Sequence, residues 1–235
     1  MRKNSDILVI IPAYNEEENI RRVVEELREK APQYDYVVVN DGSRDATGQI
    51  CRDNGYPMLE LPTNLGLSGA VRTGLIYAVR HGYEMALQYD GDGQHRWEYI
   101  TDLANCIRNG AEIAVGSRFL TESKPMTARM IGSRLLTWLI RLTSGQTLTD
   151  PTSGMRMYSR GVMGRFVANV NLRPEPDTIS FLLRSGVRVR ECQVTMRERI
   201  AGSSYLTVVH AASYMLRMVF SIVIIQRLRG KGEAK

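Results

Sequence analysis

The sequence of 235 residues is poor in cysteine and opens without an apolar leader. Its cysteines are Cys51, Cys106 and Cys192, an odd number at wide spacings, which argues against a disulfide framework and against a cysteine-rich zinc site. The N-terminal residues MRKNSD lead into a short strand-like run and lack the apolar stretch of a secretory signal. We therefore expect a cytoplasmic protein in a reducing compartment.

A dinucleotide-binding loop is also missing. Gly66, Gly69 and Gly74 do not follow the Gly-x-Gly-x-x-Gly spacing, and no acidic residue follows them at the usual distance. The sequence therefore disfavours a dehydrogenase. Close packing of a helix against a sheet is the better explanation for Gly74.

Charge is divided unevenly along the chain, although the net charge is +6. Residues 1–102 carry 11 Lys and Arg against 17 Asp and Glu, whereas residues 103–235 carry 20 against 8. The second half therefore favours an anionic partner, such as a phosphorylated acceptor, an anionic membrane surface or nucleic acid. Because no aromatic platform is interleaved with the basic residues, we expect no nucleic-acid partner.

Short aliphatic runs alternate with segments of helical periodicity. With 43% apolar residues, the chain has enough material for one substantial core. The predicted strands cover residues 7–11, 36–39, 57–61, 85–89 and 187–194, and the predicted helices cover residues 15–30, 45–54, 67–81, 126–142 and 175–184. This order predicts an α/β fold with a mostly parallel central sheet flanked by helices, and ligands beyond the carboxyl ends of its strands.

One loop at such a strand end has the composition of a metal site. Asp90 and Asp92 leave the strand at residues 85–89 together, and Gln94 follows two residues later. The intervening glycines allow a tight turn, so that three oxygen ligands can converge on a hard cation such as Mg²⁺ or Mn²⁺. Asp-Gly is also ordinary turn chemistry, so a plain surface turn is the alternative.

Five short blocks follow one another along the chain: IIPAYNEE at residues 10–17, VNDGSRD at 39–45, NLGLSGA at 64–70, DGDGQH at 90–95 and GSRF at 116–119. Together they closely resemble the family 2 inverting glycosyltransferases, and within them the polyprenyl-phosphate branch that is similar to dolichyl-phosphate mannose synthase. The resemblance covers roughly residues 6–205. It implies the glycosyltransferase A fold, a nucleotide-sugar donor and a divalent metal, Mg²⁺ or Mn²⁺.

The resemblance also implies roles for individual residues. Those that match donor-binding positions are Pro12, Ala13, Tyr14, Glu16, Asp41, Gly66, Asp90 and Arg199. The metal ligands would be Asp90, Asp92 and Gln94, and the residues assigned to catalysis and the acceptor are Asp92, Arg118, Arg129 and Asp150. Asn40 stands where many relatives have an aspartate, a minor departure because Asp41 keeps the second acid. Met155 replaces a common aromatic, which leaves the shape of the acceptor pocket open.

The chemistry of the acceptor separates two versions of this function. A sugar hydroxyl would need a carboxylate base, for which Asp150 or Glu175 are candidates, whereas a phosphate is already mostly dianionic and needs cations to position it. The arginine surplus favours a polyprenyl phosphate, with candidates Arg118, Arg129, Arg134, Arg197 and Arg199. Ordinary solvated charge is the expectation for at least half of them. A glycan-hydroxyl transferase and a non-catalytic nucleotide-sugar binder are the alternatives.

The C-terminal segment at residues 206–235 follows a predicted catalytic domain at residues 1–205. Its uninterrupted apolar stretch at 218–225 would extend only about 12 Å as a helix, so it does not span a membrane alone. Val208, Ala212, Met215, Val219 and Ile222 share one face. We expect an amphipathic helix that binds the inner face of the cell membrane, with a core or oligomer helix as the alternative and a small membrane protein as a further candidate partner.

Overall fold

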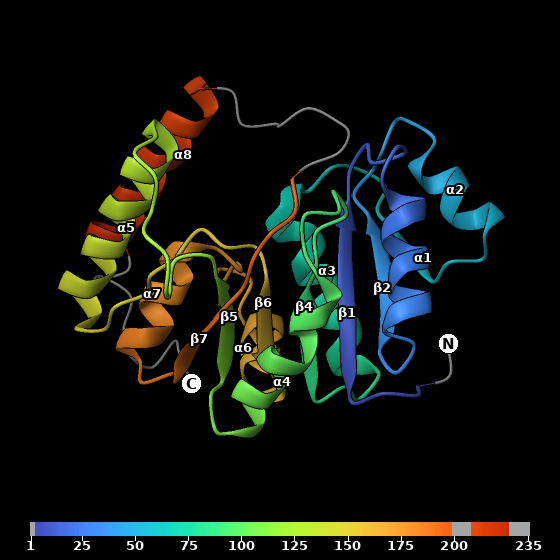
Figure 1. Cartoon of the computed structure of the whole chain (residues 1–235), viewed down its shortest axis with the longest axis horizontal. Coiled ribbons are helices and arrows are strands. Elements are labelled where there is room, and N and C mark those ends of the chain that lie inside the picture. The colour runs from blue at the N-terminus through green and yellow to red at the C-terminus, as the bar shows by residue number, and fades with distance from the viewer. Residues whose placement is uncertain (1–2, 199–207, 226–235) are drawn as a thin grey trace.

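The computed structural model describes residues 3–198 and 208–225, which form one seven-stranded sheet covered by helices on both faces (Figure 1). The strands are β1 (Ile7–Ala13), β2 (Asp35–Asn40), β3 (Met58–Glu60), β4 (Met85–Gln88), β5 (Ile113–Ser117), β6 (Arg156–Ser159) and β7 (Val189–Gln193). Their order in the sheet is β3-β2-β1-β4-β6-β5-β7. All neighbours pair in parallel except β6, which runs antiparallel between β4 and β5.

The helices form two layers, one on each face of the sheet. They are α1 (Ile20–Lys30), α2 (Thr47–Asp53), α3 (Gly66–Arg80), α4 (Ile100–Arg108), α5 (Ala128–Ser144), α6 (Arg160–Ala168), α7 (Pro176–Arg184) and α8 (Val208–Phe220), with the short turns η1 (Trp97–Tyr99) and η2 (Ser221–Ile225). Side chains of α1, α2 and α4 pack in one core cluster, and those of α3, α5, α6, α7 and α8 pack in the other.

The aliphatic run of β1 explains how one strand serves both cores. All seven of its residues are buried. Leu8 and Ile10 point into the cluster with α3, while Ile7, Val9 and Ile11 point into the cluster with α1, as the two-residue period of a strand requires. The predicted parallel sheet is confirmed, and the carboxyl ends of β1, β2 and β4 meet at one edge.

The first helix begins later than predicted. We expected residue 15 to cap a helix, but α1 starts at Ile20 and Asn15 has a φ of 54°. The Asn15 side-chain oxygen accepts a hydrogen bond from the Arg44 amide at 2.9 Å instead. Capping side chains can satisfy any nearby backbone donor, and here the neighbouring loop is the donor.

The described part of the apolar face predicted for the C-terminal helix packs against the protein, whereas the side chains of Val208 and Ala212 lie outside the described residues. Met218 and Ile222 are fully buried in the cluster that contains α5 and α7, with Met215 and Val219 beside them. Two polar contacts fasten the helix to the start of α7: the Ser221 hydroxyl donates to Asp177 at 2.6 Å, and the Arg217 guanidinium lies 3.7 Å from Glu175. The described part of this face therefore packs in the way that the core-helix alternative expects.

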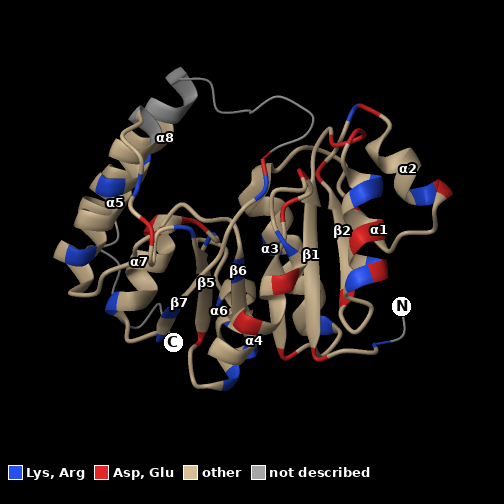
Figure 2. Cartoon of the chain, in the orientation of Figure 1, with Lys and Arg blue, Asp and Glu red and all other residues tan. Residues whose placement is uncertain are grey.

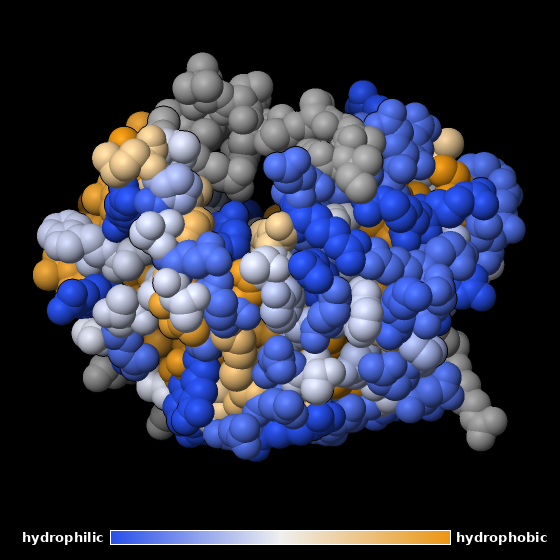
Figure 3. Space-filling view, in the orientation of Figure 1, coloured by the Kyte–Doolittle hydropathy of each residue, from blue (hydrophilic) through white to orange (hydrophobic). Residues whose placement is uncertain are grey.

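A different apolar surface faces outward on the same pair of helices. It consists of Ile131, Leu135, Trp138 and Leu142 on α5 and of Leu216, Phe220, Ile224 and Ile225 on α8 and η2, each at least 40% exposed. We call it the outer face; the two helices lie side by side in Figure 1, and apolar side chains gather over this region in Figure 3. Within residues 3–198 and 208–225, no helix is both long and apolar enough to cross a membrane.

Candidate active site

The loops that follow β1 and β2 are joined by hydrogen bonds between side chains and backbone. The amides of Asn15, Glu16 and Glu17 donate to Ser43, Thr47 and Asp45, respectively, at 2.8 to 3.0 Å. In return, the Glu17 carboxylate accepts from the Ala46 amide at 2.8 Å. These reciprocal bonds fix Pro12 to Glu16 and the loop after Asn40 as one unit beside the sheet edge.

Asp41 lies inside this unit and is almost fully buried. Its amide donates to the Ala13 carbonyl at 2.9 Å, and its carboxylate accepts from the Leu65 amide at 2.7 Å. Burial raises the pKa of Asp41, although the backbone amides of Leu65 and Gly66 oppose that shift. Asp41 therefore ties the loop at residues 64–69 to the end of β1.

The Asn40 departure also has a structural explanation. The Asn40 side-chain nitrogen lies 3.4 Å from a Glu60 oxygen, and its side-chain oxygen accepts from the Ser43 amide at 3.2 Å. An aspartate here would place a second negative charge against Glu60 and would lack the amide donor. Asn40 thus fits its surroundings without disturbing Asp41.

The loop after β4 turns sharply at the same edge. The Asp90 carboxylate accepts from the Gln88 side chain at 3.0 Å, and the Asp90 amide donates to Nδ1 of the buried His95 at 2.9 Å. The Asp92 carboxylate accepts from the Gln94 amide at 3.0 Å. His95 thereby holds the two ends of this loop together, because its Nδ1 accepts a hydrogen bond from the backbone amide of Asp90.

Two glycines allow the other loops to approach these acids. A Cβ atom at Gly91 would lie 3.0 Å from the Pro12 carbonyl oxygen. A Cβ atom at Gly154 would lie 2.5 Å from the Asp90 carboxylate, a distance that real Cβ atoms essentially never show. The loops at residues 12–16, 40–45 and 90–94 therefore lie together at this edge of the sheet, and the loop at residues 150–154 joins them.

The oxygen-rich residues of this loop fit a hard divalent cation. Asp90 and Asp92 supply carboxylates and Gln94 an amide, which are ligand types that Mg²⁺ and Mn²⁺ accept. Among the described residues no group of three His, Cys, Asp or Glu side chains is arranged to hold a metal. Two carboxylates and one side-chain amide suit a cation that takes its remaining oxygen ligands from water and a bound diphosphate, as Mg²⁺ commonly does.

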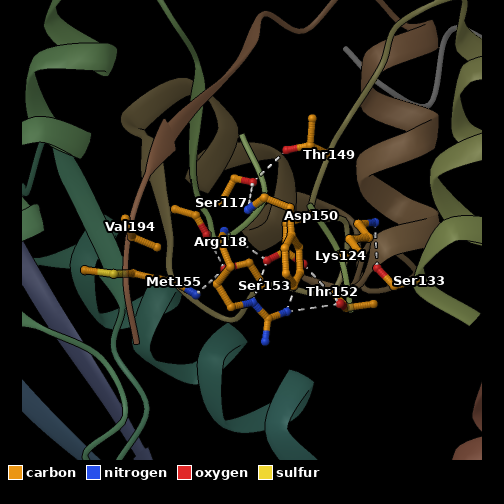
Figure 4. Close-up of polar contacts among 12 residues, drawn as sticks. Ser117, Arg118, Lys124, Ser133, Thr149, Asp150, Thr152, Ser153, Met155 and Val194 are labelled. Atoms are coloured by element: carbon orange, nitrogen blue, oxygen red, sulfur yellow. Dashed lines mark hydrogen bonds and ion pairs between the residues drawn. The ribbon is translucent and has the colours of Figure 1, made fainter. Parts of the chain in front are cut away.

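The end of β5 and the loop at residues 150–154 are organised around a buried carboxylate. Asp150 has no exposed surface, and the Arg118 guanidinium donates to both of its oxygens, from Nε at 2.7 Å and from Nη2 at 2.9 Å (Figure 4). Burial pushes the pKa of Asp150 upward, but the hydrogen bonds and charge of Arg118 outweigh it, so the pKa lies below its ordinary value. Asp150 is therefore ionised and a weak base.

A second acid holds this pair in place. The Glu191 carboxylate on β7 accepts from the amides of Thr149 at 2.7 Å and Asp150 at 2.9 Å. The Thr149 hydroxyl also bonds to Ser117 at the end of β5, at 2.6 Å. Glu191 escaped the sequence analysis because it lies in a strand, remote from Asp150 along the chain; an acid among strand residues was the one available signal.

Lys124 is a further cation that sequence reasoning missed. Its ammonium donates to the hydroxyls of Ser133 and Thr137 on α5, both at 3.0 Å, and lies 5.6 Å from the centre of the Phe119 ring. Arg118 contacts the same ring from 5.1 Å. Burial lowers the pKa of Lys124 below its ordinary value, although the charges of Asp150 and Glu191 oppose that shift. No local motif identifies this lysine.

Of the other arginines predicted to meet an acceptor phosphate, the structure describes the side chains of two. Arg134 donates to the Lys124 carbonyl at 2.6 Å and so orders the approach to α5. Arg197 pairs with Glu26 on α1, beside the loop at residues 90–94 rather than beside Asp150. Arg199 lies outside the described residues, and so does the side chain of Arg129, whose backbone begins α5.

Residues 8–166 match the family model described as glycosyl transferase family 2. The chain belongs to glycosyl transferase family 2. The polyprenol monophosphomannose synthase of Mycolicibacterium smegmatis is 29% identical to this glycosyltransferase over 220 residues, which cover 88% of this chain and 83% of that protein. The undecaprenyl-phosphate mannosyltransferase of Micrococcus luteus is 29% identical over 214 residues, 86% and 87% of the two chains.

The fold is similar to that of solved glycosyltransferases. The crystal structure of glucosyl-3-phosphoglycerate synthase from Mycobacterium tuberculosis, with Mn²⁺, uridine diphosphate and phosphoglyceric acid, matches with a TM-score of 0.68 and 16% identity, over 96% of this chain and 80% of that one. The predicted glycosyltransferase A fold and the family resemblance are thereby confirmed. The prediction of a hexosyltransferase is confirmed as well, so the alternative of a non-catalytic nucleotide-sugar binder is rejected.

Proposed function

We propose that this glycosyltransferase transfers a hexose, with inversion, from a nucleoside diphosphate sugar to a polyprenyl phosphate, with the help of Mg²⁺ or Mn²⁺, at the inner face of the cell membrane. The proposal is carried by one contact, the two-point ion pair between Arg118 and Asp150. The names of the two mannosyltransferase relatives support the acceptor class.

The donor half has the groups that a nucleoside diphosphate needs. Pro12 to Glu16 and Asp41 form a rigid wall at the carboxyl ends of β1 and β2, which we assign to the base and ribose. Asp90, Asp92 and Gln94 would hold the metal next to the diphosphate. When bound, the cation neutralises charge that develops on the leaving diphosphate oxygens.

The acceptor half suits a nucleophile that arrives already ionised. A hydroxyl acceptor needs a base, but Asp150 is held by Arg118 and has a lowered pKa. Glu175, the other candidate base, accepts from the Ser68 hydroxyl at 2.7 Å and faces Arg217. A phosphate acceptor avoids this requirement, since its second pKa is around 6. Its oxygen attacks the anomeric carbon as the bond to the diphosphate breaks.

The outer face of α5 and α8 supports a location on a membrane. Trp138 is 56% exposed, and Arg134 and Arg141 are exposed on the same helix. Apolar side chains flanked by arginines match a surface that inserts shallowly among anionic headgroups. Of the proposed acceptor cations, Lys124 bonds to α5 directly, and Arg118 contacts the same Phe119 ring as Lys124.

The test is transfer by purified protein from a panel of nucleotide sugars, with and without undecaprenyl or dolichyl phosphate, in Mn²⁺ or Mg²⁺. The account predicts a glycosyl phosphate product of inverted anomeric configuration that forms only when the polyprenyl phosphate is present. Transfer to a sugar hydroxyl in its absence would instead establish the glycan transferase. A panel that includes GDP and UDP sugars also identifies the donor.

A further inference from the structure

The loop at residues 90–94 is supported from behind by the polar side of α1. Arg22 and Glu26 lie one helical turn apart there. A Cβ atom at Gly93 would overlap the Arg22 guanidinium, so this side chain packs directly against the loop. The φ of Gly93 is +77°, a conformation that other residues rarely adopt. Arg22 therefore fixes one point of the loop by contact.

Arg197 supplies a second point of support. Its amide donates to the Gln94 carbonyl at 2.9 Å, and its own carbonyl lies 3.4 Å from the Gln94 side-chain nitrogen. The Arg197 guanidinium donates from both terminal nitrogens to Glu26, at 2.6 Å each. The pKa of Arg197 is raised, chiefly by its hydrogen bond to Glu26. The side chains are 31% and 22% exposed, which makes this pair more shielded than ordinary surface ion pairs.

These contacts form a continuous chain to a proposed metal ligand. Glu26 holds Arg197, Arg197 holds the Gln94 backbone, and the Gln94 amide donates to the Asp92 carboxylate at 3.0 Å. A shift of Gln94 would therefore rotate Asp92 or remove the hydrogen bond that orients it. Groups that orient metal ligands in this way typically contribute about 10- to 100-fold to metal affinity.

We infer that Glu26 and Arg197 are positioning residues that hold the loop at residues 90–94 in the shape that receives the metal and the donor diphosphate. The inference rests on the proposed function, because it assumes that Asp92 binds the cation. We assign neither residue a contact with substrate. Their contribution acts through Gln94.

The test is Mn²⁺ affinity in the full chain, measured by electron paramagnetic resonance with and without a nucleoside diphosphate. Glu26→Gln keeps the size of the side chain but removes its charge, and we expect about tenfold weaker Mn²⁺ binding. The matched control is Glu29→Gln, the same substitution on the same helix at a solvent-exposed pair with Lys30, which should bind Mn²⁺ as the wild type does. Thermal unfolding checks that both variants are folded.

A charge exchange and a backbone measurement sharpen the result. Glu26→Arg combined with Arg197→Glu should recover part of the Mn²⁺ affinity that either single change loses. Hydrogen exchange at the Gln94 amide should quicken in Glu26→Gln and not in Glu29→Gln. Unchanged Mn²⁺ affinity in Glu26→Gln, or an equal loss in both glutamine variants, would overturn the inference. Failure of the wild type to bind Mn²⁺ at all would instead refute the proposed metal site.

Discussion

The two halves of the site that we propose for donor and acceptor differ in the contacts that hold them. In the donor half, short loops bond to one another through backbone amides and small polar side chains, as the Asn15 to Ser43 and Glu16 to Thr47 bonds illustrate. In the acceptor half, the contacts are made by charged side chains. The buried Asp150 carboxylate accepts from Arg118, and the Asp150 backbone amide donates to Glu191. Figure 2 shows acidic residues in the loops at the carboxyl ends of β1 and β2 and basic residues on α5.

The difference fits the ligand that we propose for each half. Amides and a few carboxylates suit a nucleoside and a metal diphosphate, which need hydrogen bonds of defined direction and oxygen ligands. A lipid phosphate carries its charge at the end of an apolar chain, so its site needs cations next to a surface that faces lipid. The halves should therefore respond differently to substitution.

The largest effect is expected at Asp92. Asp92→Asn removes a charge from the proposed metal site, and turnover should fall by about a thousandfold, the scale of losing one electrostatic stabiliser of a leaving group. Unfolding temperature should change little, because the loop at residues 90–94 is held by His95 and Arg197. Initial rates across a Mn²⁺ titration measure this. Near-normal rates at high Mn²⁺ would contradict the metal assignment.

The acceptor half should instead lose stability together with activity. Arg118→Ala leaves Asp150 ionised and buried without its partner, which costs about 3–5 kcal/mol in free energy of unfolding. The double variant Arg118→Ala with Asp150→Asn should recover part of that loss. Urea unfolding measures it. A single variant as stable as the wild type would show that the ion pair does not hold this half together.

The two sides of the C-terminal helix offer a sharper contrast. Ile222→Ala removes a fully buried side chain and should cost about 2–5 kcal/mol, whereas Ile224→Ala, at 43% exposure, should stay within about 0.5 kcal/mol of the wild type. Deletion of residues 206–235 should accordingly unmask the core rather than merely release the protein from membranes. Equal stabilities for the two alanine variants would contradict the packing of η2, which continues α8.

A change on the outer face should affect binding and leave the fold intact. Trp138→Ser should reduce sedimentation with vesicles of anionic lipid several-fold, because a partly inserted aromatic side chain is lost. Its urea midpoint should match that of the wild type. Unaltered vesicle binding would point to a protein partner, or a second copy of the chain, at this face.

The smallest effect concerns pH. The pKa of Asp150 is lowered in the folded state, so the unfolded chain binds more protons near that pKa and stability rises with pH there. Asp150 therefore contributes its full stabilisation at neutral pH and loses it as the pH falls below about 4. The stability gap between the wild type and Asp150→Asn should narrow over that range. A gap that is constant down to pH 2 would rule out this linkage.

The donor half could be predicted from the sequence because its information is local. Each strand is a short aliphatic run, and each loop follows it directly, so Asp41, Asp90 and Asp92 could be assigned to one sheet edge. Even there, the hydrogen bonds between the loops were not predicted, because a segment with Asn15 and Glu17 has the composition of a helix start.

The acceptor half could not be predicted to the same depth. Arg118 and Asp150 are 32 positions apart, and Glu191 lies a further 41 along the chain, so their meeting depends on how β5, β6 and β7 pair. Nothing in the short run at β6 indicates that it inserts antiparallel between β4 and β5. The C-terminal helix posed a related problem, because an apolar stripe looks the same whether it faces a core or a membrane.

The most direct test of the account is the position of Mn²⁺ in crystals that contain a nucleoside diphosphate, located by anomalous scattering. The account predicts one peak between the carboxylates of Asp90 and Asp92 and the diphosphate, on the side of the loop at residues 90–94 that faces Arg118. A peak elsewhere, or carboxylates that turn away from the diphosphate, would contradict it.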